Sequence, residues 1–241
     1  MTSKVKKTKR RADQLRELRF KRNFIESAAG SVLIEMGKTR VLCNGSFVNE
    51  VPRWRQESGL GWLTAEYCML PAASSPRKPR SRTGHTDGRG TEIQRLVGRV
   101  LRAVVDFKKL GENTIYLDCD VLQADGGTRT AAINGSYVAL VDAVRYGLQE
   151  KYLKENPLTG MVAAVSVGMV KGKAVLDLDY ELDSTAEVDM NVAMTEDGRF
   201  IEIQGTSEQV PYSYEELEKM LGLARKGIKK ILSEQKRCLR L

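Results

Sequence analysis

A strand, a two-glycine turn and a long helix follow one another directly between residues 114 and 148, and this succession restricts the fold more than any other stretch. Over residues 114–122 apolar and polar side chains alternate, which is the period of a β-strand. Over residues 131–148 the apolar side chains recur with the spacing of one helix face. The residues in between therefore form a strand-to-helix turn.

The turn contains Gly126, Gly127, Thr128 and Arg129. Glycine allows a ligand to approach the backbone closely, and Thr128 is expected to cap the following helix. The free N–H groups at a helix start bind anions, and Arg129 adds a forked donor that suits phosphate. An ordinary corner with a surface arginine fits the same residues, because short Gly-Gly turns are common.

The composition is that of a soluble globular protein with a basic charge balance. The 241 residues are 41% hydrophobic and 29% charged, with a formal net charge of +8. A basic balance favours nucleic acid as the partner, although good solubility explains it equally well. We expect a basic, flexible tail over residues 1–11, which either contacts RNA phosphates or is only solvated. No linker divides residues 12–241, which we expect to form a single domain.

The cysteines and the histidine limit the chemistry and the compartment. Cys43, Cys68, Cys119 and Cys238 are far apart and show no metal-ligand pairing. Cys43 and Cys119 lie in strand-like apolar runs and are expected to be buried free thiols. Free thiols fit a reducing compartment, so we expect a cytoplasmic protein. His85 is the sole histidine, which excludes mechanisms that need two. We find no secretory signal and no apolar run of membrane-spanning length, so no membrane partner is expected.

The remaining elements indicate an α+β fold with mixed sheets and long helices. A strand is expected over residues 63–70, an irregular loop over 71–90, and helices from residues 91 and 214, the second behind a capping box of Ser213 and Glu216. Three hairpins are expected, over residues 31–35 with 39–47, 161–170 with 174–179, and 188–194 with 200–204.

Basic side chains concentrate in the loop and on the helix that follows it. Arg77 and Arg80 lie in the loop, and Arg89 is expected just before the helix, where it can face into a site. Arg99 belongs to a basic stripe with Arg95 and Arg102. A solvated helix face and a solvated loop explain these charges without any ligand.

Asp183 and Asp189 form a second group of residues that can take part in catalysis. Asp183 is expected in a loop and Asp189 at the edge of a strand. Two carboxylates brought together hold Mg²⁺, or one acts as general acid while the other orients the reactants. Acidic loop residues are common, so a solvated loop remains open from the residues alone.

Taken together, these residues resemble the ribonuclease PH family, the phosphate-dependent 3′-exoribonucleases, nearly end to end. The matching strings are long and unusual. They are residues 11–16, 61–67, 69–71, 92–96, 118–120, 123–130, 183–191 and 202–206.

The resemblance implies a fold of two βαβ-like halves, a hexameric ring built as a trimer of dimers, and trimming of tRNA 3′ ends. It implies inorganic phosphate as co-substrate, release of nucleoside diphosphates, and Asp183 and Asp189 as the catalytic pair. We expect Asp189 to be the general acid and Asp183 to orient Mg²⁺ or a water molecule. The phosphate-binding residues that it implies are Arg89, Gly127, Thr128 and Arg129.

Backbone-guiding contacts to RNA are expected from Arg99, Arg77 and Arg80. The chain departs from the family pattern at Ala72, where arginine is usual, at Gly90, at residues 134–136 and in the proline-rich loop 74–82. These departures bear on RNA affinity and ring contacts, because the anion-site and carboxylate residues are intact.

Two other readings remain. A ring subunit that binds RNA without catalysis would have lost the acidic pair or the arginine of the turn, and both are present. A hydrolytic nuclease with two Mg²⁺ ions needs more clustered carboxylates and leaves the anion turn without a role.

Overall fold

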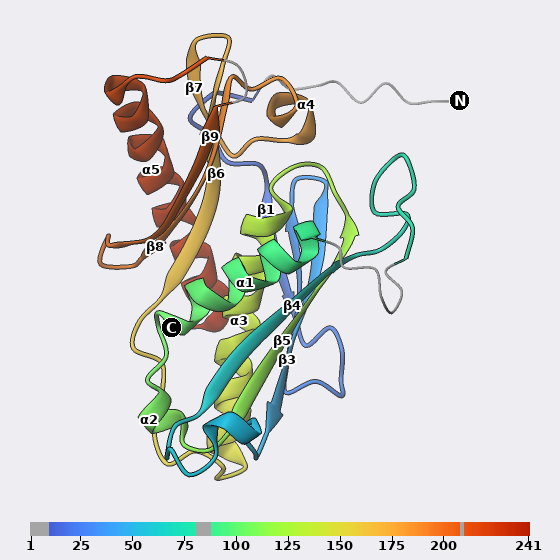
Figure 1. Ribbon diagram of the computed structural model, residues 1–241, viewed down its shortest axis with the longest axis vertical. Coiled ribbons are helices and arrows are strands. Elements are labelled where there is room, and N and C mark those ends of the chain that lie inside the picture. Colours follow the sequence, from blue (N-terminus) through green and yellow to red (C-terminus); the bar gives the residue numbers. More distant parts are fainter. Residues whose placement is uncertain (1–9, 81–87, 208–209) are drawn as a thin grey trace.

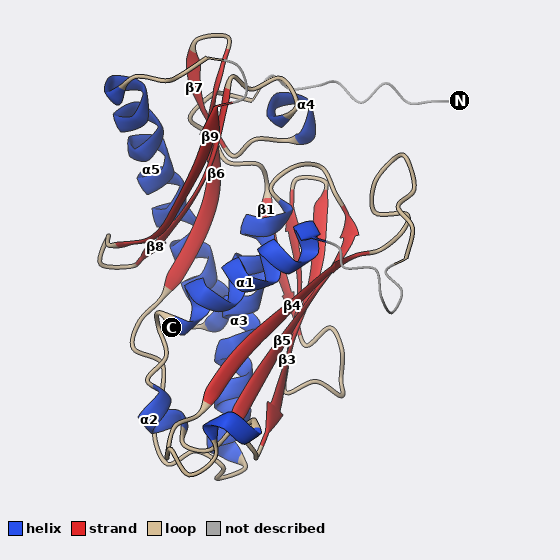
Figure 2. Ribbon diagram, in the orientation of Figure 1, coloured by secondary structure: helices blue, strands red, loops and turns tan. Residues whose placement is uncertain are grey.

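Two β-sheets form the frame of the protein (Figures 1 and 2). The structure is a computed structural model, and it describes residues 10–80, 88–207 and 210–241. The first has the order β1-β2-β3-β5-β4 and the second the order β7-β6-β8-β9. The strands of the first sheet are β1 (Leu18–Arg22), β2 (Gly30–Met36), β3 (Thr39–Val48), β4 (Trp62–Met69) and β5 (Thr114–Gln123). Those of the second are β6 (Val162–Val170), β7 (Lys173–Leu176), β8 (Val188–Thr195) and β9 (Phe200–Ser207).

Helices α1, α3 and α5 are long and pack on the sheets, and Figure 2 shows the helices in blue. The helices are α1 (Gly88–Arg102), α2 (Phe107–Leu110), α3 (Thr128–Gln149), α4 (Tyr180–Asp183) and α5 (Tyr214–Leu239), with a 3₁₀ turn at Arg53–Arg55. Helix α3 packs against β2, β3 and β5 and also against β6, so it joins the two sheets. Helix α5 packs along β6, β7 and β8.

The α+β fold with mixed sheets is confirmed. Strands β4 and β5 run parallel and are joined through α1, while the other pairings are antiparallel. The three hairpins are confirmed as β2–β3, β6–β7 and β8–β9, and the capping box at Ser213 opens α5. Strand β1 was not expected, because its five residues contain only two apolar side chains and three cationic ones.

Buried polar side chains fix α3 against the second sheet. Asn134 is fully buried, and its side-chain amide donates to the Ala164 carbonyl and accepts from the Ala164 N–H, both at 2.8 Å. The Gln235 side chain of α5 donates to the Asn134 carbonyl at 3.3 Å. Asn134, one of the departures from the family pattern, therefore connects the two halves.

The structure corrects three local expectations. Helix α1 begins at Gly88 instead of residue 91, so Arg89 lies in its first turn and not before it. Gly127 is the N-cap of α3, and Thr128 is already helical because glycine takes the left-handed backbone that this corner needs. Asp183 ends the short helix α4 instead of lying in a loop.

Residues 1–9 of the expected tail and His85 lie outside the described residues. Arg10, at the end of that tail, is anchored: its guanidinium donates to the Asp177 carbonyl at 2.7 Å and to the Leu176 carbonyl at 3.2 Å. The tail boundary and the single domain over residues 12–241 stay predictions. None of the helices in the described ranges is long and apolar enough to cross a membrane.

Candidate active site

A cavity of about 1100 Å³ lies where the first turn of α1, the start of α3, α4 and the second sheet meet. From the first half it takes side chains of the 74–79 loop and of the two helix starts. From the second half it takes Ser166, Asp183, Asp189, Asn191 and Gln204. The cavity is therefore built by both halves of the chain.

This cavity collects most of the residues predicted from the sequence. Its lining includes the expected phosphate ligands, both aspartates and one loop arginine, namely Arg89, Gly127, Thr128, Arg129, Asp183, Asp189 and Arg77. Arg80 and Arg99 do not line it. The anion-binding turn and the carboxylate pair, which are more than fifty residues apart in sequence, thus face one space.

The turn has a backbone that only glycine adopts readily. Gly126 and Gly127 have φ angles of +74° and +66°. A Cβ on Gly126 would lie 2.6 Å from the Asp179 carbonyl carbon and 2.7 Å from the Tyr180 nitrogen. The turn is therefore packed directly onto the backbone that leads into α4, whose N-cap is Asp179. This contact fixes the turn relative to Asp183.

Arg16 and Thr39 hold the turn from behind. The Arg16 Nη1 donates to the Asp125 carbonyl at 2.6 Å, and its Nη2 pairs with Asp177 at 2.7 Å. The Thr39 hydroxyl donates to the Gly126 carbonyl at 2.7 Å and accepts from the Asp125 N–H at 3.0 Å. Arg16, Asp177 and Thr39 are all buried, so these contacts are shielded from water.

Arg129 belongs to a polar network that spans both halves. Its Nη1 donates to Gln204 Oε1 on β9 at 2.9 Å and lies 3.4 Å from Glu92 Oε1 on α1. Gln204 Nε2 donates to the same Glu92 oxygen at 3.1 Å. These three side chains line the cavity together, so the guanidinium is oriented before any ligand arrives.

The charges of the cavity affect its carboxylates. Burial raises the pKa of Asp183, and the negative charge of Asp189 raises it further, while Arg89, Arg129 and Arg16 act in the opposite direction. Asp183 therefore holds a proton more readily than a solvated aspartate does. Two carboxyl groups that interact beside a cationic turn suit acid–base chemistry on a phosphoryl group.

Tyr67 supports the start of α3. Its hydroxyl donates to the Thr128 hydroxyl at 2.9 Å, and burial raises the pKa of Tyr67 to about 12. The phenol therefore stays protonated at neutral pH and keeps this hydrogen bond. Thr128 is held by a side chain of β4 and does not act as the helix cap.

Arg99 and the other predicted RNA contacts are exposed or paired. The Arg99 guanidinium binds Glu202 of β9 through two bonds of 2.9 and 3.0 Å. Arg77 and Arg80 are exposed in the loop after β4. Their contacts with RNA stay predictions.

The donors for a divalent cation are few. Asp183 and Asp189 line the cavity, but the described part of the chain contains no group of three or more His, Cys, Asp or Glu side chains placed to hold a metal ion. Two carboxylates are still enough for Mg²⁺, which commonly completes its shell with water and substrate phosphates.

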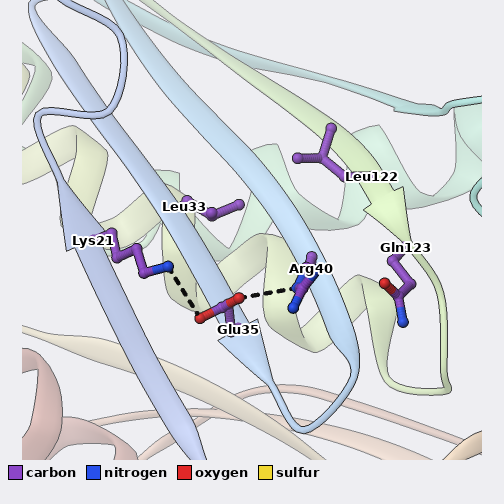
Figure 3. A pocket seen from close by; sticks show the side chains of 6 residues that line it. All are labelled: Lys21, Leu33, Glu35, Arg40, Leu122 and Gln123. Carbon is purple, nitrogen blue, oxygen red and sulfur yellow. Dashed lines mark ion pairs between the residues drawn. The ribbon is translucent and has the colours of Figure 1, made fainter.

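A smaller cavity of about 300 Å³ lies on the first sheet, away from these residues. Figure 3 shows Glu35 between Lys21 and Arg40. Its carboxylate oxygens lie 3.6 Å from Lys21 Nζ and 2.9 Å from Arg40 Nε. The three charges pair with one another, and none of the predicted site residues lines this cavity. It is a satisfied surface network.

Sequence reasoning assigned no role to several residues that build the site. Glu92, Gln204 and Arg16 lie within the strings that carried the family resemblance, so the signal was present without a mechanism. Thr39 gave no signal, because a threonine at the start of a strand is ordinary. Only the approach of β3 to the turn reveals it.

Comparison with known proteins agrees with this geometry. Residues 14–145 match the model of the 3′ exoribonuclease family, domain 1, and residues 160–227 match its domain 2. A ribonuclease PH of Corynebacterium kroppenstedtii is 54% identical over 240 residues, which are 99% of this chain and 94% of that protein.

Solved structures share the fold. Rice (Oryza sativa) Rrp46 superposes with a TM-score of 0.78 at 18% identity, over 96% of this chain and 98% of that one. A chain of the Archaeoglobus fulgidus exosome with RNA bound to the active site gives 0.75 at 21% identity, over 93% and 90%. With both family domains matched and a relative 54% identical over nearly its full length, the chain belongs to the 3′ exoribonuclease family of ribonuclease PH.

Proposed function

We propose that the cavity between the two halves is the active site, where inorganic phosphate meets the 3′ end of an RNA. The chain is a phosphorolytic 3′-to-5′ exoribonuclease that acts on tRNA precursors, as its family membership indicates. One observation carries the assignment of the site: a two-glycine anion turn with two arginines and a pair of carboxylates line the same cavity.

The proposed roles follow from charge and position. Phosphate binds at Gly127 and Thr128 and is clamped by Arg129 and Arg89, so that one of its oxygens attacks the last phosphodiester opposite the leaving 3′ oxygen. The leaving oxygen takes a proton from Asp189. The products are a nucleoside diphosphate and an RNA shorter by one residue. No covalent intermediate is needed, so the protein contributes positioning and charge neutralisation.

Asp183 and Asp189 are the proposed ligands of Mg²⁺. A cation held by Asp183 and Asp189 would supply neutralisation of negative charge on the phosphodiester. The raised pKa of Asp183 means that cation binding there competes with a proton, so Mg²⁺ affinity should rise with pH. Arg77, Arg80 and Arg99 are proposed guides of the RNA backbone.

Further proposals concern the assembly and the compartment. We infer a hexameric ring, supported by the ribonuclease PH relative and by fold similarity to exosome subunits. Light scattering should give six times 26.9 kDa, and a monomer at assay concentration would contradict the ring. The free cysteines support a reducing, cytoplasmic compartment.

The decisive experiment identifies the released nucleotide. A 3′-tailed RNA is incubated with the protein with and without inorganic phosphate. Phosphorolysis requires phosphate and releases nucleoside diphosphates, and the reverse reaction should extend RNA from diphosphates. Nucleoside monophosphates released without phosphate would show hydrolysis instead.

A further inference from the structure

The backbone of the turn, and not only its arginine, has to be oriented if the turn is to bind an anion. Gly126 and Gly127 line the cavity, and no described residue is recorded as accepting a hydrogen bond from the N–H of either. Gly126 and Gly127 are successive turn residues with positive φ angles, and the successive backbone N–H groups of a turn can form a concavity that binds phosphate. What remains to be explained is what holds these amides toward the cavity.

Through its hydroxyl, Thr39 contacts two peptide units of the turn, those on either side of the Asp125–Gly126 peptide. Its hydroxyl accepts from the Asp125 N–H at 3.0 Å and donates to the Gly126 carbonyl at 2.7 Å. The side chain is fully buried, at the first residue of β3, and does not line the cavity. One hydroxyl therefore closes the turn, from a residue that does not line the cavity.

The direction of the amides follows from these contacts. In a planar trans peptide the C=O and the N–H point in opposite directions. Because the Gly126 carbonyl is directed at Thr39, the N–H of Gly127 is directed away from it. Because the Asp125 carbonyl is directed at Arg16 Nη1 at 2.6 Å, the N–H of Gly126 is directed away from Arg16. Neither Thr39 nor Arg16 lines the cavity, whereas both glycines do.

We propose that Thr39, assisted by Arg16, is a positioning residue for the phosphate site, which holds the turn so that the Gly126 and Gly127 amides face the cavity. Thr39 touches neither phosphate nor RNA. The inference rests on the proposed function, since it concerns the same phosphate. Its consequence is specific: loss of the hydroxyl weakens phosphate binding and leaves RNA binding intact.

Thr39→Val tests this, because valine keeps the shape and removes both hydrogen bonds. The matched control is Thr114→Val. Thr114 is also buried, and its hydroxyl donates to the Glu50 carbonyl at 2.7 Å, but it lies at the opposite end of β5 from the turn. Thr39→Ser retains the hydroxyl, and Thr39→Ala is a second removal should valine disturb folding.

Initial rates are measured on a 3′-tailed RNA, with phosphate and RNA titrated separately, and Tm is measured for each variant. Thr39→Val should raise the apparent phosphate KM by about 5- to 30-fold, the effect of one or two lost hydrogen bonds, with the RNA KM unchanged. Thr39→Ser should have a phosphate KM close to that of the wild type. Thr114→Val should lower Tm by about as much as Thr39→Val does, without changing the phosphate KM.

Two failures are distinguishable. If the wild-type protein degrades RNA without phosphate, the proposed function is wrong and the inference falls with it. If the wild type requires phosphate but Thr39→Val and Thr39→Ala keep its phosphate KM, or Thr114→Val raises that KM equally, Thr39 is merely structural and the inference alone is overturned.

Discussion

Removal of the Arg129 guanidinium should weaken phosphate binding far more than RNA binding. In the free protein, Nη1 carries both recorded contacts of this group, the 2.9 Å bond to Gln204 and the 3.4 Å ion pair with Glu92. Within the described ranges, no acceptor is recorded for its Nε or Nη2. The guanidinium has five N–H donors, so the edge that carries Nε and Nη2 is available to phosphate.

The size of the effect follows from those free donors. A hydrogen bond to a charged group contributes about 1.5–3 kcal/mol, which corresponds to about 10- to 150-fold in an equilibrium constant. Arg129→Ala should therefore raise the apparent phosphate KM about 10- to 150-fold or abolish saturation. The RNA KM should change little, because Gln204 and Glu92 still bond to each other at 3.1 Å without the arginine.

Arg99→Ala is the matched control. Arg99 also reaches β9, where it binds Glu202 two residues from Gln204, but it does not line the cavity. Its half-exposed ion pair is worth only about 0.2–1 kcal/mol, so Tm should fall slightly. The phosphate KM should be unchanged, and a shallower salt dependence of RNA binding would support the backbone contact.

The assay titrates phosphate at saturating RNA and RNA at saturating phosphate, for the wild type and both variants. Wild-type phosphate saturation in Arg129→Ala would refute the placement of the nucleophile at this turn. An equal rise of the phosphate KM in Arg99→Ala would show that the effect comes from loosened contact between the halves and not from a lost ligand.

Asp189→Asn keeps the size of the side chain but removes the acid, so turnover should fall about 100-fold or more while RNA binding persists; near-normal turnover would exclude Asp189 as the acid. Gly126→Ala should lower Tm by more than the roughly 2–8 °C that corresponds to left-handed backbone strain of about 1–2 kcal/mol, because the added Cβ would also clash with the backbone at residues 178–180. Gly172→Ala is the control, because Gly172 has a φ of +69° and an added Cβ there would meet nothing within 4 Å. This variant has the backbone strain without the clash, so its Tm should fall less; an equal fall in Tm for the two variants would refute the packing argument. The raised pKa of Asp183 means that the folded protein binds this proton more tightly than the unfolded chain, so its ionisation costs stability as pH rises from its ordinary pKa of 3.8 through the folded value. Asp183→Asn should therefore raise Tm at pH 7 and leave it nearly unchanged below pH 3.8, and an unchanged Tm at pH 7 would contradict the raised pKa.

Local patterning determined most of the elements. The alternation before the turn and the apolar stripe after it predicted β5 and α3, and glycines at the bends marked the hairpins. These signals are short-range, since side-chain periodicity follows from backbone geometry alone. Strand β1 was not predicted, because it contains only two apolar residues and its pairing with β2 is what makes it a strand.

The sequence also supplied the chemical groups of the site. A two-glycine turn with Arg129, and a carboxylate pair at Asp183 and Asp189, were each recognisable as separate motifs. Composition and spacing could not say that they face one cavity, and only the resemblance to a family placed them together. The structure reaches the same grouping through packing of the turn against residues 178–180.

Tertiary structure alone decided how the site is supported. Arg16 and Asp177 are separated by 161 residues, and Thr39 and Gly126 by 87, yet each pair is hydrogen-bonded in the interior. No periodicity links such positions. Their contact arises because the fold brings the segment before β1, the start of β3 and the residue after β7 against the turn. The polar groups buried there must find partners, since a buried polar group without a partner costs free energy. The sequence therefore identifies the groups proposed to contact the substrate, while only the tertiary structure identifies the buried side chains that orient them.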